Sequence, residues 1–345
     1  MQENLLSQDN RSGIDGASGP SPLAVLSPLV PRYGVRCSLE EFQAAVNLVF
    51  HDIEAEVYDD IHQDMWLSLP RQYELLAADV MKLNPAKPLR MLDIGCGTGL
   101  SSELLMRTQL GAHIGSLHLI DTSPKMLGLA RKRLSAHPLE IRETNGFISG
   151  LTEAGSFDVI LTCSVLHHIP DLPAFLADVR RLQRPGGVFL HLQDPNADAI
   201  EGAALQQRTQ AYEAWKKPLL PKPLQRLRPS RAIPAIWRRV TGTQPKSYLE
   251  RVNDELLKRG VIAKPMAEQD IWAVTDIRIF SGEGVSASSL AENLPGYRNV
   301  STRTYAFFSV LASSLPPKMA KEEESLIDAG SRDGSYLAAA WQLEK

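Results

Sequence analysis

The sequence has few cysteines, no excess charge of one sign and no long hydrophobic run. Its 345 residues include three cysteines, Cys37, Cys96 and Cys163, whose wide spacing fits neither a disulfide framework nor a metal-binding pattern. The formal net charge of −3 gives the chain no overall attraction for nucleic acid. No apolar run approaches the roughly 18 residues of a membrane-spanning helix, and the N-terminus lacks the basic-then-apolar order of a signal peptide. These absences predict a cytoplasmic protein whose cysteines form neither disulfides nor a metal centre.

Short apolar segments alternate with amphipathic ones between residues 89 and 193. This pattern predicts strands at 89–94, 117–120, 139–143, 157–164 and 188–193, with helices at 100–110, 124–135 and 172–182 between them. Two more strands are expected at 299–311 and 335–343, and two more helices at 286–294 and 318–328. Apolar strands separated by helices form a parallel sheet that is covered on both faces, so the fold class is α/β.

The rest of the chain divides by composition. Residues 1–35 are rich in Ser, Gly, Pro and Asn, which predicts a flexible tail. Residues 36–84 form an N-terminal helical lid, with one helix from a capping box at Ser38 and Glu41 to about Met65 and another from about Pro70 to Leu83. Residues 85–195 form the core, 196–285 a helical cap inserted after the fifth strand, and 286–345 complete the core.

The stretch MLDIGCGTGL, residues 91–100, places three glycines directly after a predicted strand. Such a turn brings bare backbone and a helix N-terminus against a ligand. A dinucleotide fingerprint needs glycine or alanine where Leu100 stands, and the chain contains no phosphate loop of the form GxxxxGK[ST]. The ligand therefore lacks a pyrophosphate, and Asp93 at the entrance indicates that it carries a positive group.

The second strand ends in Asp121-Thr122-Ser123-Pro124. A carboxylate at this position can accept both hydroxyl groups of a ribose. Alternatively, Asp121 belongs to the cap of the helix that begins at Pro124. Together with the glycine turn, the ribose role is favoured.

Four segments in this order, MLDIGCGTGL, LIDTSPKML, FDVILTCSVLHHI and LQRPGGVFLHL, resemble the class I S-adenosylmethionine-dependent methyltransferases. The resemblance covers about residues 45–195. It implies a Rossmann-like, doubly wound sheet of seven strands, parallel except for the last, and S-adenosylmethionine as cofactor. It assigns the methionine part of the cofactor to Asp93, Gly95, Cys96, Gly97, Thr98 and Gly99, the ribose to Asp121 and Thr122, the adenine to Met126, Asn145 and Gly146, and the amino group to Cys163 and Ser164. Asn145 stands where the family usually has an aspartate, and its carbonyl oxygen can replace that carboxylate.

His167 and His168 follow the fourth strand, where the family's methyl acceptor meets the cofactor. An imidazole has an ordinary pKa near 6.5, which suits proton removal at neutral pH. The alternative is that one caps the next helix and the other packs beneath it.

The first helix carries His51, Glu54, Tyr58 and His62 on one face. Similar methyltransferases place a Tyr-Asp pair of such a helix over the cofactor, which makes Tyr58, beside Asp59, a further catalytic candidate. This face either lines the acceptor pocket, binds a metal through His51, Glu54 and His62, or is a solvated polar stripe.

Ten Lys or Arg residues and one acidic residue occur between Lys216 and Arg251, interleaved with leucines and prolines. This segment is a lid that leaves its basic residues exposed to solvent, or a surface that binds an anionic or membrane-borne acceptor, or a surface that binds RNA. Further along, Trp272, Asp276, Arg278 and Phe280 alternate and would share a face in a strand.

These features predict a methyltransferase that acts on a small-molecule or lipid-like acceptor, with peripheral membrane contact as an option. The alternatives are an RNA methyltransferase, which the overall charge disfavours, and a non-catalytic protein that binds S-adenosylmethionine. The sequence leaves open which atom of the acceptor is methylated, and also the oligomeric state.

Overall fold

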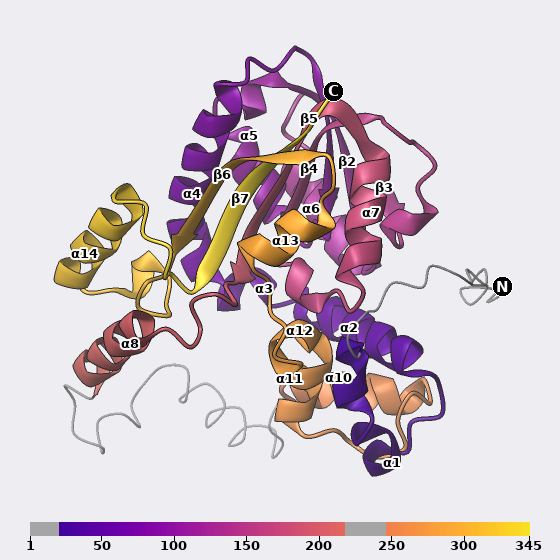
Figure 1. Cartoon of the computed structure of the whole chain (residues 1–345). Helices are drawn as coiled ribbons and strands as arrows, with labels where there is room; N and C mark the ends of the chain where they lie inside the picture. The colour runs from indigo at the N-terminus through magenta and orange to yellow at the C-terminus, as the bar shows by residue number, and fades with distance from the viewer. Residues whose placement is uncertain (1–20, 218–245) are drawn as a thin grey trace.

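The computed structural model describes residues 21–217 and 246–345, and its centre is a seven-stranded sheet (Figure 1). Its strands are β1 Leu89–Ile94, β2 Ile114–Asp121, β3 Glu140–Asn145, β4 Phe157–Cys163, β5 Gln183–Pro195, β6 Tyr297–Tyr305 and β7 Tyr336–Leu343. They lie in the order β3-β2-β1-β4-β5-β7-β6. The last strand, β7, is antiparallel to both β5 and β6, whereas the neighbours among β1 to β5 are parallel. The predicted fold class is therefore confirmed.

Helices cover both faces of the sheet, as the alternating pattern predicts. On one face lie α4 Gln63–Met81, α5 Leu100–Met106 and α6 Pro124–Leu134, and on the other lie α7 Leu172–Leu182 and α13 Ala287–Asn293. The strand order reverses between β1 and β4, so the carboxyl ends of these two strands border a crevice. In open parallel sheets, ligands bind at this switch point.

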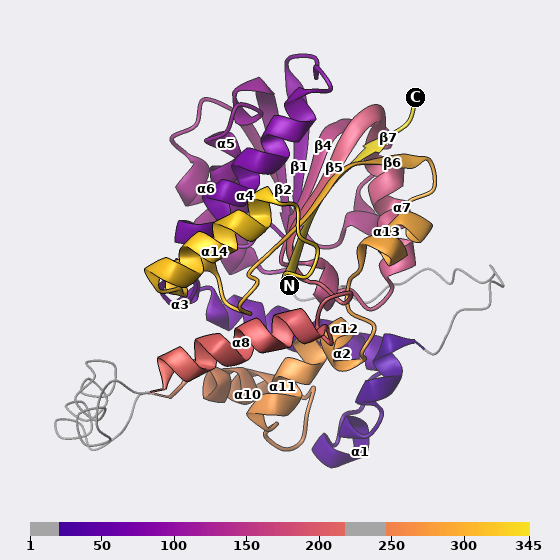
Figure 2. The ribbon, with the colours of Figure 1, turned by 60° about the vertical axis from the view of Figure 1, so that its left-hand side comes forward.

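A separate helical cap lies beyond the carboxyl ends of the parallel strands (Figures 1 and 2). It combines η1 Pro22–Leu26, α1 Leu29–Tyr33 and α2 Leu39–Glu54 with α10 Tyr248–Lys258, α11 Glu268–Thr275 and α12 Ile277–Phe280. These helices share a hydrophobic core of their own, which includes Phe42, Val46, Phe50, Leu256, Ile271 and Val274. The N-terminal helices and the insertion, which the sequence suggested as two units, thus pack as one cap.

Two predicted boundaries near the N-terminus differ from the structure. Residues 21–35 are not a tail, because η1 and α1 bury Leu23, Leu26 and Leu29 in the cap; residues 1–20 lie outside the described part. The first helix ends at Glu54, a short α3 follows at Tyr58–Ile61, and α4 then continues through Pro70. Leu69 and Tyr73 beside this proline are fully buried against the sheet, and that burial outweighs the hydrogen bond that proline cannot make.

Two predicted strand segments also differ. The strand predicted at 299–311 ends at Tyr305, because Ala306 has a positive φ of 59° and the buried carboxylate of Glu323 accepts hydrogen bonds from the backbone N–H groups of Ala306 and Phe307 (2.6 and 2.8 Å). The alternation from Trp272 to Phe280 belongs to helices α11 and α12, not to a strand.

Two further α-helices of the described residues are α8 Ala203–Lys216 and α14 Pro317–Asp328. Most of the basic segment 216–251 falls at 218–245, outside the described residues. Within residues 21–217 and 246–345, no helix has both the length and the apolar character needed to cross a membrane.

Candidate functional site

The glycine turn after β1 is held open by the neighbouring strand. The N–H of Gly95 donates to the carbonyl of Ile120 (2.8 Å), and the N–H of Gly97 donates to the carboxylate of Asp121 (2.9 Å). Gly97 has a φ of +52°, and a Cβ there would meet no atom within 4 Å. At Gly99, with a φ of +81°, a Cβ would lie 3.0 Å from the Cα of Ala130. The first of these glycines therefore leaves space for a ligand, and the second allows α5 and α6 to pack closely.

A cavity of about 910 Å³ lies between this turn and the cap. The predicted site residues on its wall are Gly95, Gly97, Asp121, Thr122, Met126, Gly146, Cys163, Ser164, Tyr58, His167 and His168. The cap contributes Phe50, Trp272 and Ile279 to the same wall. The structure thus brings the candidate cofactor residues and the candidate catalytic residues to one space.

Five predicted cofactor residues, Asp93, Cys96, Thr98, Gly99 and Asn145, are not on the cavity wall. Asp93 is buried beneath the turn, where its Oδ2 accepts hydrogen bonds from the hydroxyls of Ser101 and Ser102 (2.9 and 2.6 Å). Burial raises the pKa of Asp93 to about 7, against the opposing effect of these hydroxyls. Asp93 therefore supports the start of α5 from below.

Thr98 contacts the lid and not the cavity. Its hydroxyl donates a hydrogen bond to Asp59 (3.0 Å) and accepts one from Arg133 (2.6 Å). The guanidinium of Arg133 also pairs with Asp59 and lies 4.7 Å from the centroid of the Trp66 ring. The Tyr-Asp pair of the lid is thus divided, because Tyr58 faces the cavity and Asp59 fastens the lid to the glycine turn.

Asp121 lies at the end of β2, and its two oxygens accept hydrogen bonds from the N–H groups of Gly97 and Ser123 (2.9 and 2.8 Å). The side chain that caps α6 is Ser123, which accepts from the N–H of Met126. Burial raises the pKa of Asp121, against these backbone hydrogen bonds. Asn145 donates to the backbone carbonyls of Asp121 and Thr122 (3.0 and 2.8 Å) and so braces this strand end.

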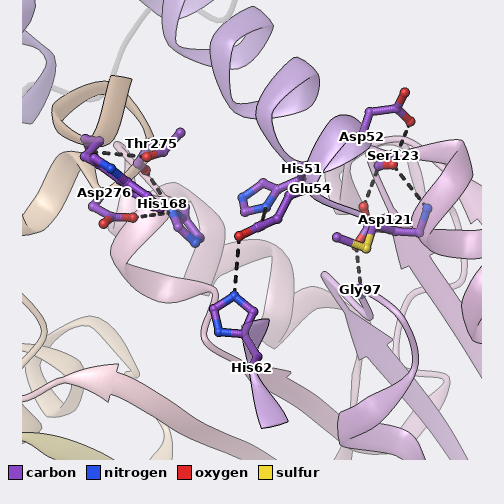
Figure 3. A network of polar contacts seen from close by, with 12 residues as sticks. His51, Asp52, Glu54, His62, Gly97, Asp121, Ser123, His168, Thr275 and Asp276 are labelled. Carbon is purple, nitrogen blue, oxygen red and sulfur yellow. Dashed lines mark hydrogen bonds and ion pairs between the residues drawn. The ribbon is translucent and has the colours of Figure 1, made fainter. Parts of the chain in front are cut away.

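The polar face of the first helix is folded around a buried carboxylate (Figure 3). The two oxygens of Glu54, which is 3% exposed, each lie 3.3 Å from an imidazole, one of His51 and one of His62. Burial disfavours the charge on Glu54, but the two imidazoles outweigh it and lower its pKa to about 2. Burial likewise opposes the charge on His51, and the bond to Glu54 outweighs it and raises the pKa of His51. These residues line the cavity rather than forming a solvated stripe.

His167 is fixed by Asp194, a residue that the sequence did not single out. Its Nδ1 lies 2.9 Å from Oδ1 of Asp194, a fully buried carboxylate at the end of β5 that also accepts from the backbone N–H of His167. Nδ1 of His168 lies 2.8 Å from the carbonyl of Thr275 in the cap (Figure 3). Burial, together with the nearby His167 and His51, holds the pKa of His168 well below its usual value, so this ring is neutral.

Two signals in the sequence point to residues that were overlooked. Asp194 follows an apolar strand, in the same way as Asp93 and Asp121 do, and carboxyl strand ends border the ligand crevice. Phe147, directly after Gly146, lines the cavity and is 65% exposed, although an aromatic side chain is normally buried.

Comparisons with known proteins agree with this geometry. A family model described as a methyltransferase domain matches residues 92–189. The ubiquinone biosynthesis O-methyltransferase of Dinoroseobacter shibae is 32% identical over 218 residues, which cover 61% of this chain and 77% of the relative. The protein of the same name from Sinorhizobium fredii is 35% identical over 117 residues, which cover 34% of this chain and 45% of the relative, so the match spans less than half of that protein.

A solved structure of an S-adenosylmethionine-dependent methyltransferase from Mesorhizobium loti is 16% identical, with a TM-score of 0.39, over 76% of this chain and 95% of that one. The Dinoroseobacter relative is the informative match, because the chain covers more than two thirds of its length. With the sheet order and the glycine turn, this relationship shows that the chain belongs to the class I methyltransferases, the enzymes that use S-adenosylmethionine as methyl donor.

Proposed function

We propose that this enzyme methylates an oxygen atom of a small, lipid-like acceptor. The observation that carries the proposal is that one cavity of about 910 Å³ has on its wall both the glycine turn and His167, whose Nδ1 is held by Asp194. The curated relatives are named O-methyltransferases of ubiquinone biosynthesis, which supports oxygen as the acceptor atom.

The wall of the cavity fits S-adenosylmethionine. When bound, this cofactor supplies a methyl group on a positively charged sulfur atom. The space above Gly97 admits the cofactor against bare backbone, and the Asp121 carboxylate, at the end of β2, accepts the ribose hydroxyls. Met126 and Phe147 offer apolar surface to the adenine, with Gly146 between them in the wall. Cys163 lies beside the methionine part, and Asp93, Cys96, Thr98, Gly99 and Asn145 hold the surrounding backbone.

The acceptor occupies the part of the cavity beneath the cap. His167 accepts the proton of the acceptor hydroxyl at Nε2, because Asp194 keeps Nδ1 as the N–H donor and stabilises the imidazolium that forms. Tyr58 positions the acceptor as a neutral phenol, since burial raises its pKa far above the usual value. His168 connects the acceptor end of the cavity to the cap through its hydrogen bond to the carbonyl of Thr275.

The cap makes the acceptor end apolar. Phe50, Trp272 and Ile279 line it from the cap, and Val310 and Leu311 line it from the segment after β6. Such a wall suits a ring or an isoprenoid-like chain better than a charged polymer. This is the reason for proposing a lipid-like acceptor.

The proposal is tested by incubating the purified protein with methyl-labelled S-adenosylmethionine and a prenylated phenol that carries a free hydroxyl. We expect a methyl ether as the product, and no product from the same compound with that hydroxyl already methylated. Asp194→Asn should lower kcat by about 10²–10⁴-fold, as for the loss of a general base, with little change in cofactor affinity. Methyl transfer to nitrogen or sulfur acceptors but to none of a panel of phenols would contradict the proposal.

A further inference from the structure

A bulge in β5 gives one residue of the cavity wall an unusual backbone. The register of β5 against β7 shifts between His191 and Asp194, where two residues of β5 face one of β7. Within this bulge Gln193 has a φ of 63°, in the left-handed region that residues with a Cβ seldom adopt. β5 lies beside β7, and β7 beside β6 (Figure 1). Bulges and left-handed residues concentrate near active sites, where they direct a side chain towards a ligand.

The side chain of Gln193 is buried and is fixed at its oxygen. It is 5% exposed, and its Oε1 accepts a hydrogen bond from the hydroxyl of Tyr305 in β6 at 2.8 Å. Burial raises the pKa of Tyr305 well above its usual value, so this phenol is neutral and its O–H is the donor. No other acceptor for the hydroxyl is found within residues 21–217 and 246–345. The amide oxygen of Gln193 therefore faces Tyr305, and the amide nitrogen faces away from it.

The amide nitrogen of Gln193 is open to the cavity. Gln193 forms part of the cavity wall, and no group in the described part of the chain accepts a hydrogen bond from its Nε2. Nε2 is not enclosed by protein atoms either, unlike the buried and unpartnered ring nitrogens of His191. An amide nitrogen carries two N–H donors and no acceptor. Gln193 therefore presents hydrogen-bond donors to a ligand in this space.

These donors lie beside the residues proposed for proton removal. Gln193 directly precedes Asp194, whose carboxylate holds His167, so one bulge carries both side chains. The ring of Tyr336, 5.8 Å from that of Tyr305, lines the same cavity. Next to aromatic and aliphatic side chains, a hydrogen bond is strong and a donor without a partner is costly. An amide at this position therefore distinguishes ligands that offer it an oxygen atom from ligands that do not.

We propose that Gln193 determines which acceptors the enzyme binds, by donating a hydrogen bond from Nε2 to a second oxygen atom of the acceptor, one that is not methylated. The inference rests on the proposed function, in which His167 takes the proton from a first hydroxyl. Hydroxyl, ether and carbonyl oxygens all fit this role, because each accepts a hydrogen bond from an amide N–H. Tyr305 is a positioning residue, since it touches Gln193 and orients the amide. An acceptor without the second oxygen leaves the donor unpaired and binds more weakly.

Two prenylated phenols that differ in one oxygen atom test the inference. One carries a methoxy group on the ring, ortho or meta to the free hydroxyl, and the other carries an ethyl group at the same position. Ethyl has nearly the shape of methoxy but accepts no hydrogen bond. Calorimetry in the presence of S-adenosylhomocysteine, the demethylated cofactor, measures binding without turnover. At one of the two ring positions we expect the wild type to bind the methoxy compound about 10- to 100-fold more tightly than the ethyl compound.

Substitutions at Gln193 and Tyr305 assign this preference to the amide. Gln193→Met keeps the length of the side chain and removes its donors, so the preference should fall to about threefold or less, through weaker binding of the methoxy compound alone. Tyr305→Phe should reduce the preference by a smaller factor. The double variant Gln193→Met with Tyr305→Phe avoids leaving a buried hydroxyl unpaired, and it should show the same loss as Gln193→Met. Gln207→Met, at an exposed glutamine of α8, should keep the wild-type preference.

Circular dichroism checks that each variant is folded. Equal binding of the two compounds by the wild type, or an unchanged preference in the folded double variant, overturns this role of Gln193 and leaves methyl transfer to oxygen intact. A preference that both Gln193 variants lose supports the role. If that preference is found but S-adenosylmethionine yields no methyl ether from either compound, the role of Gln193 is supported and the proposed function is contradicted.

Discussion

At the scale of single residues, three carboxylates at the carboxyl ends of parallel strands have different roles. Asp93 is buried beneath the turn, Asp121 faces the cavity, and Asp194 holds His167. The sequence identified the first two because each precedes a recognisable turn. It could not separate their tasks, since the exposure of each carboxylate depends on side chains from α5 and from the cap that are distant in sequence.

Asp121 is the residue on which cofactor affinity should depend most. Asp121→Asn keeps the shape of the side chain but removes its charge. Hydrogen bonds to charged groups are worth roughly 1.5–3 kcal/mol, so we expect the affinity for S-adenosylmethionine to fall about 10- to 100-fold. Isothermal titration calorimetry measures this, with the exposed Glu292→Gln as a control that should bind like wild type. A change of less than twofold in Asp121→Asn would mean that another group holds the ribose.

At the scale of the elements, the break between α2 and α4 is bridged by Glu54, which contacts His51 in its own helix and His62 at the start of α4. The sequence predicted one unbroken helix here, because His51, Glu54, Tyr58 and His62 keep a helical spacing. Helical spacing in a sequence shows only which residues would share one face of a helix if the helix were continuous. The break arises from tertiary contacts, including the pairing of Asp59 with Arg133 on α6.

The bridge should make the lid sensitive to pH. The raised pKa of His51 means that its contribution is complete below about 6.5, its unfolded value, and is lost as pH rises through the folded value. The lowered pKa of Glu54 means that its contribution is complete above about 4.3 and is lost as pH falls towards 2. The pair therefore stabilises the protein most between these limits.

Replacing Glu54 with glutamine tests this window. We expect Glu54→Gln to lower the free energy of unfolding by about 2 kcal/mol at pH 5.5, and by less at pH 8.5, because the contribution of His51 is lost as pH rises through its raised pKa. Urea unfolding at the two pH values measures the difference. Glu255→Gln, at a partly exposed carboxylate that pairs with Lys258 and Arg259 on its own helix, should give a small effect at both. An equal loss at both pH values for Glu54→Gln would show that the bridge is not ionic.

Two glycines of the turn after β1, Gly97 and Gly99, should respond differently to substitution by alanine. Gly97→Ala should cost about 1–2 kcal/mol of stability for its left-handed backbone and should weaken cofactor binding further, because the methyl group enters open space on the cavity wall. Gly99→Ala carries the same strain and also forces α5 away from α6, which adds about 1–3 kcal/mol. Chemical unfolding measures the loss of stability in each variant, and calorimetry measures the loss of cofactor affinity. The assignment of Gly99 to helix packing is contradicted if Gly97→Ala is the less stable variant.

At the scale of the whole molecule, the sheet could be predicted and the cap could not. β1, β4 and β5 are buried on both faces, so their apolar runs mark them plainly in the sequence. The cap core combines residues 23–53 with residues 252–277, and no local pattern connects two such segments. For the same reason Asp276 remained an undecided residue, although it lies against both site histidines.

A cap with its own core should loosen separately from the sheet. Phe42 is fully buried in that core, and Phe42→Ala should remove about 3–5 kcal/mol of packing. We expect faster amide hydrogen exchange in α2, α10 and α11, and little change in β1 and β4. Leu176→Ala, in α7 against the sheet, should give the reverse pattern. Uniform acceleration in Phe42→Ala would show that cap and sheet open together.

The pairing of the first helices with the insertion also bears on how the chain is made. Arg32 and Tyr33 both contact Asp270, more than two hundred residues later. On the ribosome, α1 and α2 emerge long before α10 and α11 are synthesised, whereas β1 to β5 can begin to pair as soon as β5 appears. The newly made N-terminal helices must therefore wait with Leu26, Phe42 and Val46 uncovered, which makes them the natural place for a chaperone to act on this nascent polypeptide.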